Sequence, residues 1–175
     1  MQKKNPWKKL DSKFIYKNPW INVREDSVIR PDGKPGIYGV VETRKATGVV
    51  AINEHKEIYL VGQFRYTMDQ YSWEIPEGGA EEGESPIDAI KRELAEEAGV
   101  AANKWTELGS EIHLSNCHSS ERAYIFLAED LKELESNSPE GTEDLQVKKV
   151  PFNEAIRMIE NGEINDAITI IALYR

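Results

Sequence analysis

Cysteine is nearly absent from this sequence of 175 residues, which contains only Cys117. A single cysteine excludes any disulfide bond within the chain. Proteins that rely on disulfides belong to oxidising compartments, so this scarcity is typical of a protein in a reducing compartment. We therefore expect a cytoplasmic protein whose fold depends on an apolar core, and a chain of this length is large enough to form one.

Long hydrophobic runs are also missing. No apolar stretch approaches the roughly 18 residues that a membrane-spanning helix needs. The opening segment MQKKNPWKKLD contains lysines but no apolar region of the kind found in secretory signals. We expect no membrane partner and no secretory signal.

Positive charge is in deficit, because 22 Lys and Arg residues stand against 31 Asp and Glu residues, which gives a net charge of −9. This balance argues against general binding to nucleic acid or to anionic membranes. It does not exclude a phosphorylated ligand, because metal ions or a few arginines can reverse the sign of the charge locally.

The order of the predicted elements indicates mixed α and β structure. Segments 20–30 and 36–44 are β-branched and aromatic and flank the turn PDGKPG, a pattern typical of a β-hairpin. Further strands are predicted at 48–53, 57–66, 106–114, 122–131 and 145–152, and helices at 86–98, 153–161 and 165–175. Neighbouring strands predominate, so we expect a layered α+β fold rather than a doubly wound parallel sheet.

The helix predicted at 86–98 has clear ends. Ser85 is a suitable N-cap, Pro86 suits the first helical position, and Gly99 suits the end. At 3.6 residues per turn its apolar side chains fall on one stripe, which should face the core. These side chains are Ile87, Ile90, Leu94 and Ala98.

Three glutamates of this helix, Glu93, Glu96 and Glu97, lie beside the apolar stripe, and Glu93 and Glu97 share one side because they are four residues apart. The preceding loop, PEGGAEEGES, adds four more glutamates. A solvated acidic face is one interpretation, since exposed like charges at this spacing cost only about 0.2–0.5 kcal/mol. Carboxylates that converge would repel by about 4 kcal/mol per close pair, and divalent cations such as Mg²⁺ would remove that cost.

The loop and helix together resemble the Nudix box, in which glycine, five residues, glutamate and seven residues precede Arg-Glu-apolar-x-Glu-Glu-x-Gly-apolar. The matching residues are Gly78, Glu84, Arg92, Glu93, Leu94, Glu96, Glu97, Gly99 and Val100. Nine specified positions over 23 residues make this resemblance specific. The segments VGQFRY, WEIPEGG, GTEDLQVKKVPFNEAI and NGEINDAITIIALYR are similar to the branch of the family that hydrolyses ADP-ribose and nucleoside diphosphate sugars.

The resemblance implies an α/β/α sandwich with a mixed β-sheet and an N-terminal antiparallel hairpin. It implies that residues 1–45 form the hairpin region and a dimerisation element, that residues 46–175 form the hydrolase domain, and that the protein is a homodimer. The implied reaction is metal-dependent cleavage of the pyrophosphate bond of ADP-ribose or a nucleoside diphosphate sugar. The products would be a nucleoside monophosphate and a sugar phosphate, and the implied cofactor is Mg²⁺, with Mn²⁺ as the alternative.

The resemblance also assigns the acidic residues of the box. Glu93 and Glu97 are implied as metal ligands that act in catalysis, and Glu96 as a further ligand or a partner of the ligands. Glu77 would contribute its backbone carbonyl to a metal ion, because it directly precedes the first glycine of the box.

Four residues of the box have implied structural roles. Glu84 and Arg92 resemble the ion pair that fixes the loop against the helix in this family. Gly78 and Gly99 occupy the two glycine positions of the box.

Several residues outside the box are candidates for binding the substrate. Arg65 is a candidate clamp for the diphosphate, since a guanidinium can hold two phosphate oxygens at once, although a surface arginine on a strand is an equal alternative. Arg44 and Glu74 are weaker candidates for the same cleft. Trp20 and Trp73 are candidates for stacking on a base, although aromatic residues near strands more often belong to the core.

The sequence leaves the catalytic base open. In the resembling branch a glutamate from a late mobile loop often serves, and the irregular segment SNSPEGTEDL offers Glu140 and Glu143 on either side of Gly141. The spacing of this segment departs from the family pattern, so neither residue is preferred. Glu121 is a third candidate.

Two other kinds of function remain. Hydrolysis of dinucleoside polyphosphates or of another nucleoside diphosphate derivative uses the same scaffold. The second alternative is a non-enzymatic sensor of ADP-ribose. Such sensors usually have a degraded box and an added DNA-binding domain, whereas the box here is intact.

Overall fold

The computed structural model describes residues 4–135 and 144–175, and its contacts divide the chain into two compact units. The first unit comprises Met1–Arg44 and His113–Arg122, and the second comprises Lys45–Ile112 and Ala123–Arg175. The segment His113–Arg122 therefore belongs with the N-terminal residues and not with the second unit.

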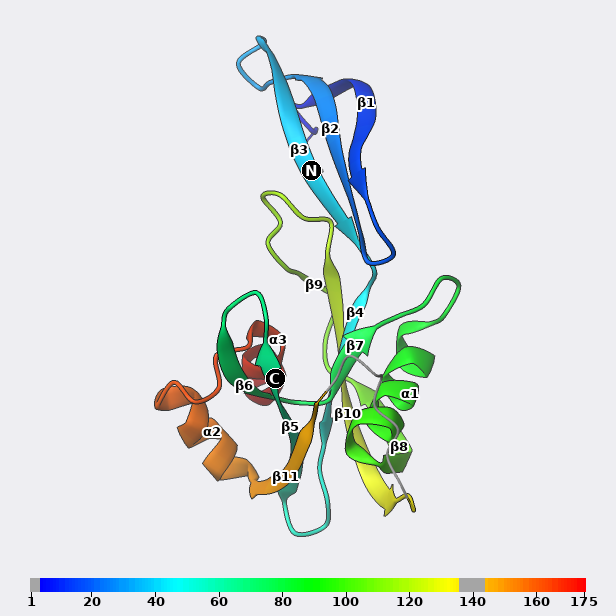
Figure 1. The fold of residues 1–175 in the computed structure, drawn as a ribbon, viewed down its shortest axis with the longest axis vertical. Helices are drawn as coiled ribbons and strands as arrows, with labels where there is room; N and C mark the ends of the chain where they lie inside the picture. The colour runs from blue at the N-terminus through cyan, green and yellow to red at the C-terminus, as the bar shows by residue number, and fades with distance from the viewer. Residues whose placement is uncertain (1–3, 136–143) are drawn as a thin grey trace. The chain divides into compact units, whose positions relative to one another are not determined.

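The first unit is an antiparallel sheet of three strands in the order β1 (Lys8–Lys17), β2 (Ile21–Ile29) and β3 (Pro35–Thr43), coloured blue to cyan in Figure 1. The hairpin of β2 and β3 lies where the sequence predicts it. Strand β1 was not predicted, because all of its residues are exposed and two register shifts against β2 disturb the alternation of apolar and polar side chains. The segment His113–Arg122 joins the edge of β3, where the backbone N–H of Val41 donates to the carbonyl of His118 at 2.8 Å.

The second unit contains two sheets. In the first, β7 (Glu77–Gly79), β4 (Ala46–Ala51), β10 (Arg122–Glu133) and β8 (Val100–Glu107) lie side by side, and β9 (Ile112–His113) also pairs with β10. Strands β4 and β10 run parallel and the other pairs are antiparallel, so this sheet is mixed. The second sheet is antiparallel, with β5 (Glu57–Arg65) between β11 (Gln146–Pro151) and β6 (Gln70–Glu74).

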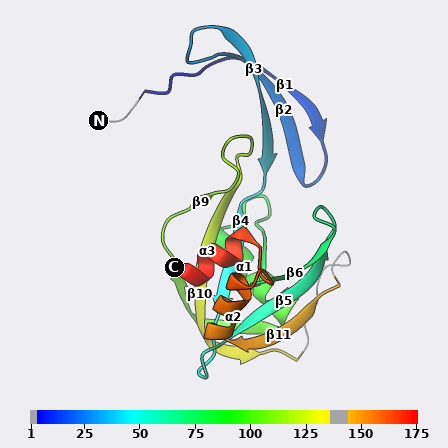
Figure 2. The same ribbon diagram turned by 90° about the vertical axis from the view of Figure 1, so that its left-hand side faces the viewer.

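Three helices complete the second unit: α1 (Pro86–Ala98), α2 (Phe152–Glu160) and α3 (Ala167–Tyr174). Ile90 and Leu94 of α1 pack against Val49 of β4 in a buried apolar cluster. The neighbouring residue Gly48 faces the other way, where an added Cβ would lie 2.7 Å from Ile168 of α3. The mixed sheet thus lies between α1 on one face and α3 on the other, as Figure 1 shows, and Figure 2 gives the view from the side of α3. This arrangement confirms the expected α/β/α sandwich.

Strand boundaries are where the sequence prediction was least accurate. The strand predicted at 106–114 is in fact β8, which starts at Val100 directly after the helix end, and the short β9. Gly109 separates them because its φ of +77° bends the chain out of the extended conformation. Strands β6 and β7 were not predicted, since both are short and β7 lies inside a glycine-rich segment that reads as a loop. In the described parts of the chain, none of the helices is long and apolar enough to cross a membrane.

Candidate active site

Helix α1 and strand β7 bring the two central glutamates of the box together. Glu97 is only 1% exposed, and its Oε2 accepts a hydrogen bond from the backbone N–H of Glu77 at 2.9 Å. Glu93 lies against Gly78, where an added Cβ would come within 2.1 Å of the Glu93 Cδ. Both carboxylates therefore lie against strand β7, where the glycine-rich segment begins, and the missing side chain of Gly78 is what lets Glu93 lie there.

Arg92 holds the rest of the box in place. Its guanidinium forms ion pairs with Glu84 at 3.2 Å, Glu93 at 2.9 Å and Glu96 at 2.9 Å. It also donates to the carbonyl of Gly79 at 3.3 Å. The hydrogen bonds to Glu84 are the main cause of a raised pKa of Arg92, and the same contact lowers the pKa of Glu84. The structure thus contains the ion pair between loop and helix that the resemblance implies, and it extends that pair to two further glutamates.

A second group of charges surrounds Arg65 at the end of β5. The Nε of Arg65 donates to both carboxylate oxygens of Glu74, at 2.9 and 3.1 Å. The Nη2 of Arg65 donates to Glu77 Oε1 at 2.9 Å. Glu74 is buried, whereas the side chain of Arg65 keeps 38% of its surface exposed. Arg65, proposed from sequence as a phosphate clamp, is therefore oriented by two carboxylates while part of it still faces solvent.

The two carboxylates beside Arg65 differ in their ionisation. Burial favours protonation of Glu74, but hydrogen bonding and the charge of Arg65 hold the pKa of Glu74 below its ordinary value. Burial raises the pKa of Glu77 well above its ordinary value, and the nearby charges of Asp166 and Glu74 raise it further. Asp166, the N-cap of α3, was not singled out from the sequence. The only feature of the sequence that could have pointed to Asp166 is its position before the last predicted helix.

Trp73 lies on β6 beside two partners. Its ring meets that of Tyr71 edge to face with centroids 5.5 Å apart, and Lys148 Nζ from β11 lies 3.7 Å from its ring centroid. Burial lowers the pKa of Lys148. The pairing of β5 with both β6 and β11 brings these side chains together, and no sequence pattern pointed to Lys148.

The remaining candidates belong to the first unit or fall outside the described residues. Arg44 and Trp20 belong to the first unit, in which Arg44 donates to the carbonyl of Pro19 at 3.4 Å and Trp20 is 66% exposed. Glu121 also belongs to the first unit, and burial raises its pKa. Glu140 and Glu143 lie outside the described residues.

The donor set of the box fits a divalent cation. Glu93, Glu96 and Glu97 supply hard carboxylate oxygens from one helix, and Glu97 is almost fully buried beside the backbone of Glu77. A buried carboxylate costs several kcal/mol unless it is paired or coordinates a metal ion. These residues, with the backbone carbonyl of Glu77, are therefore suited to hold Mg²⁺ or Mn²⁺.

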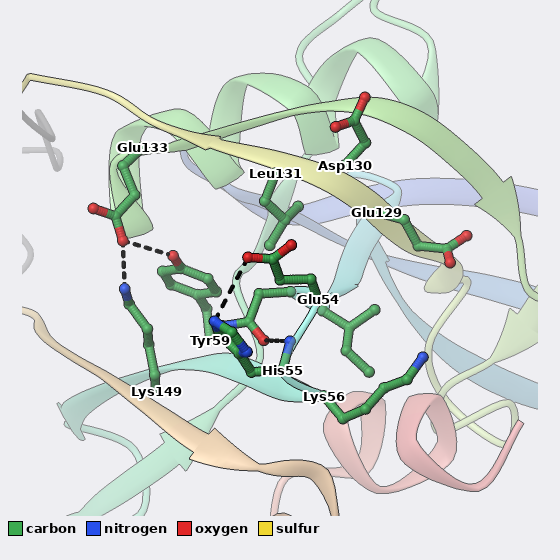
Figure 3. A pocket seen from close by; sticks show the side chains of 11 residues that line it. Glu54, His55, Lys56, Tyr59, Glu129, Asp130, Leu131, Glu133 and Lys149 are labelled. Atoms are coloured by element: carbon green, nitrogen blue, oxygen red, sulfur yellow. Dashed lines mark hydrogen bonds and ion pairs between the residues drawn. The ribbon is translucent and has the colours of Figure 1, made fainter.

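A hollow of about 530 Å³ lies apart from these residues, between the turn after β4 and the ends of β10 and β11 (Figure 3). Some of its charged groups are paired with one another: Glu133 accepts from Tyr59 at 3.0 Å and forms an ion pair with Lys149, and His55 lies 3.6 Å from Glu54. None of the candidate site residues lines it. It adds nothing to the chemistry of the box.

Comparison with known families gives two matches along the chain. Residues 42–172 match the model of the NUDIX domain. Residues 7–41 match the model described as the nucleoside diphosphate sugar hydrolase N-terminal domain.

Individual relatives agree with these matches. The ADP-ribose pyrophosphatase of Bacillus subtilis (strain 168) is 31% identical over 95% of this chain and 90% of its own length. The GDP-mannose pyrophosphatase of Enterobacter sp. (strain 638) is 30% identical over 73% of this chain and 70% of its own length. A crystal structure of an ADP compounds hydrolase superposes with a TM-score of 0.86 over 99% of this chain and 94% of that one, at 23% identity, which shows that the fold is shared.

The box motif, the sandwich that carries it, and a family match over most of the chain lead to one conclusion: this chain belongs to the Nudix family.

Proposed function

We propose that this protein is a metal-dependent hydrolase that cleaves the pyrophosphate bond of ADP-ribose or of a nucleoside diphosphate sugar. The products are a nucleoside monophosphate and a sugar phosphate. The observation that carries the proposal is the complete box in one place, with Glu93 and Glu97 against Glu77 and Gly78 of β7 and Arg92 bracing the loop. Two relatives named as an ADP-ribose pyrophosphatase and a GDP-mannose pyrophosphatase support the choice of substrate class.

The cofactor in this proposal is Mg²⁺, with Mn²⁺ as the alternative, held by Glu93, Glu97, Glu96 and the backbone carbonyl of Glu77. Such ions, when bound, neutralise charge on the diphosphate and lower the pKa of a coordinated water. The residues of the chain supply the positioning. The hydrogen bond from Glu77 N–H fixes the Glu97 carboxylate, and the ion pairs of Arg92 fix Glu93 and Glu96.

Arg65 is the proposed clamp for the diphosphate. Its contacts with Glu74 and Glu77 hold the guanidinium in one orientation, and its exposed part is free to meet phosphate oxygens. In this proposal Glu74 acts on the substrate through Arg65. Trp73 lines the substrate pocket. The roles of Trp20 and Arg44 in binding the nucleotide or sugar stay predictions made from the sequence.

The attacking water needs a base or a further metal ligand. We assign this role to Glu140 or Glu143, both of which lie between β10 and β11. A carboxylate on such a connection can reach the water after the substrate has bound.

The proposed assembly is a homodimer formed through the first unit. Six large apolar side chains of this unit are each more than half exposed: Leu10, Phe14, Ile15, Tyr16, Trp20 and Ile37. Apolar groups in such number on a small sheet are typical of an interaction surface. A second copy of the chain would cover them and also protect the sheet edges.

A substrate panel tests the proposal. The purified protein with Mg²⁺ is given ADP-ribose, nucleoside diphosphate sugars, dinucleoside polyphosphates and nucleoside triphosphates, and the products are identified by mass spectrometry. We expect the highest kcat/KM for ADP-ribose or a nucleoside diphosphate sugar. Preference for a dinucleoside polyphosphate or a triphosphate would overturn the substrate class, and binding of ADP-ribose without turnover would indicate a sensor.

A further inference from the structure

A second group of carboxylates lies beside the box and includes a residue from the start of a different helix. Glu74 of β6, Glu77 of β7 and Asp166 at the start of α3 each place one carboxylate oxygen within 4.8 Å of the other two. Among these residues only Glu77 is also part of the proposed box site, and there it acts through its backbone carbonyl. We call Glu74, Glu77 and Asp166 the β6–α3 cluster.

The charges of the β6–α3 cluster do not balance. Arg65 forms ion pairs with Glu74 and Glu77, and its guanidinium is the positive charge in both contacts. With all three carboxylates ionised, the single guanidinium leaves two formal negative charges in a largely buried space. Glu97 adds to this excess, because its charge acts on Glu77 as well.

One oxygen of the cluster is left without a partner. The side chain of Glu77 is 10% exposed, and its Oε1 is taken by Arg65 at 2.9 Å. Its Oε2 is buried and has no hydrogen-bond partner in residues 4–135 and 144–175. Buried carboxylate oxygens are normally hydrogen-bonded or bound to a cation, so this atom points to a missing ligand rather than to solvent.

We propose that the β6–α3 cluster binds a divalent cation of the hard, oxygen-preferring class, in addition to the ions held by the box glutamates. Carboxylate oxygens within 4.8 Å of one another match the span of ligands around one such ion, since metal–oxygen distances are about 2.1 Å for Mg²⁺ and about 2.3–2.6 Å for Ca²⁺. The ion neutralises the two excess charges and supplies a partner for Glu77 Oε2. Arg65 keeps its contacts with Glu74 and with Glu77 Oε1.

Because Asp166 lies at the start of α3, the proposed ion would connect this helix to β6 and β7. Asp166 Oδ2 accepts from the backbone N–H of Thr169 at 2.6 Å, and the Thr169 hydroxyl accepts from the backbone N–H of Ile75 at 3.0 Å. The start of α3 is thus already tied to the segment between β6 and β7. A cation shared by Asp166, Glu74 and Glu77 adds a second tie at the same place, directly beside the proposed phosphate clamp.

The test counts bound Mn²⁺ by electron paramagnetic resonance during titration of the full chain, without substrate. Asp166→Asn removes one anionic ligand and keeps the helix cap, because Asn caps helices as well as Asp. Glu77→Gln removes a second anionic ligand and keeps both an oxygen that accepts from Arg65 and the backbone carbonyl. We expect each variant to bind one Mn²⁺ fewer than the unaltered chain, and Glu93→Gln to retain the ion of the cluster.

Asp69→Asn is the matched control, since Asp69 is exposed in the same unit and its backbone φ of +53° suits Asn as well as Asp. It should bind as many ions as the unaltered chain. If Asp166→Asn and Glu77→Gln both bind the same number of ions as Asp69→Asn with the same affinity, the proposed site is wrong. Because no substrate is present, this result is independent of whether the proposed hydrolysis occurs.

Discussion

At the scale of single residues, the site depends on carboxylates that the fold holds in place by hydrogen bonds and ion pairs. Glu97 is 1% exposed, yet it accepts a hydrogen bond from the backbone of Glu77 and belongs to a helix that also carries Glu93 and Glu96. A residue kept only for packing in this position would be apolar, because burying a charged group costs free energy that only partners or a bound cation offset. A buried carboxylate at this position of the helix is therefore compatible with the proposed role of Glu97 as a metal ligand.

Glu97→Gln should keep the fold and reduce kcat at least about 100-fold, the scale expected when one electrostatic contributor is lost. The change is nearly isosteric, and the amide oxygen can still accept from Glu77 N–H. Steady-state kinetics with Mg²⁺, together with a melting curve, measures both effects. Glu82→Gln, in the exposed part of the loop, is the control and should leave kcat unchanged. A near-normal kcat for Glu97→Gln would refute the assignment.

Gly78→Ala should reduce turnover by displacing Glu93. The added Cβ would lie 2.1 Å from Cδ and 2.2 Å from Oε1 of Glu93, so the carboxylate has to move. A displacement of about 1 Å can cost about 100-fold in rate. Gly39→Ala is the matched control, because a Cβ there meets no atom within 4 Å. Equal kcat values for the two variants would show that the position of Glu93 is not limiting.

The residues of the box could be identified from sequence because their spacing is fixed within one loop and one helix. Glu74 was a candidate for the same cleft as Arg65, but the ion pairs of Arg65 with Glu74 and Glu77 could not be predicted. Arg65, Glu74 and Glu77 come from three different strands, and only the register of β5 with β6 and of β4 with β7 brings their side chains together. A register of this kind is set by tertiary packing and leaves no local pattern in the sequence.

At the scale of elements, helices were predicted more accurately than strands. Helix α1 has the predicted bounds, because Ser85 caps its start and Gly99, with a φ of +65°, ends it. Strands β1, β6 and β7 were missed or misplaced, since they gain their stability from neighbouring strands and not from an alternating pattern of their own. The site at the start of β7 was therefore predicted as a loop.

The connection between β10 and β11 carries the prediction for the catalytic base. One of Glu140→Gln and Glu143→Gln should lower kcat by about 100-fold or more, the usual effect of losing a general base. KM should change much less, because Arg65 and the box residues would still hold the diphosphate. Glu135→Gln, an exposed glutamate at the end of β10, is the matched control. If both variants turn over normally, the base is another residue, with Glu121 and the glutamates of the box as the next to test.

At the scale of the whole molecule, the apolar side chains of the first unit predict self-association. Sedimentation equilibrium at micromolar concentration should give the mass of a homodimer. Phe14→Lys and Ile37→Lys each place a charge on this surface, at side chains that are 65% and 69% exposed, and should shift the equilibrium toward monomer. Tyr66→Lys, at a side chain of the second unit that is 93% exposed, should not. Monomer alone for the unaltered chain would contradict the proposed dimer.

The most direct test of the account is hydrolysis of ADP-ribose in H₂¹⁸O with Mg²⁺, followed by mass spectrometry of both products. Attack by water at phosphorus predicts AMP and ribose 5-phosphate with one ¹⁸O on a phosphate group, and no products after the divalent metal has been removed by chelation. Label on the sugar carbon would exclude attack at phosphorus. Full turnover in metal-free protein would contradict the role given to Glu93 and Glu97.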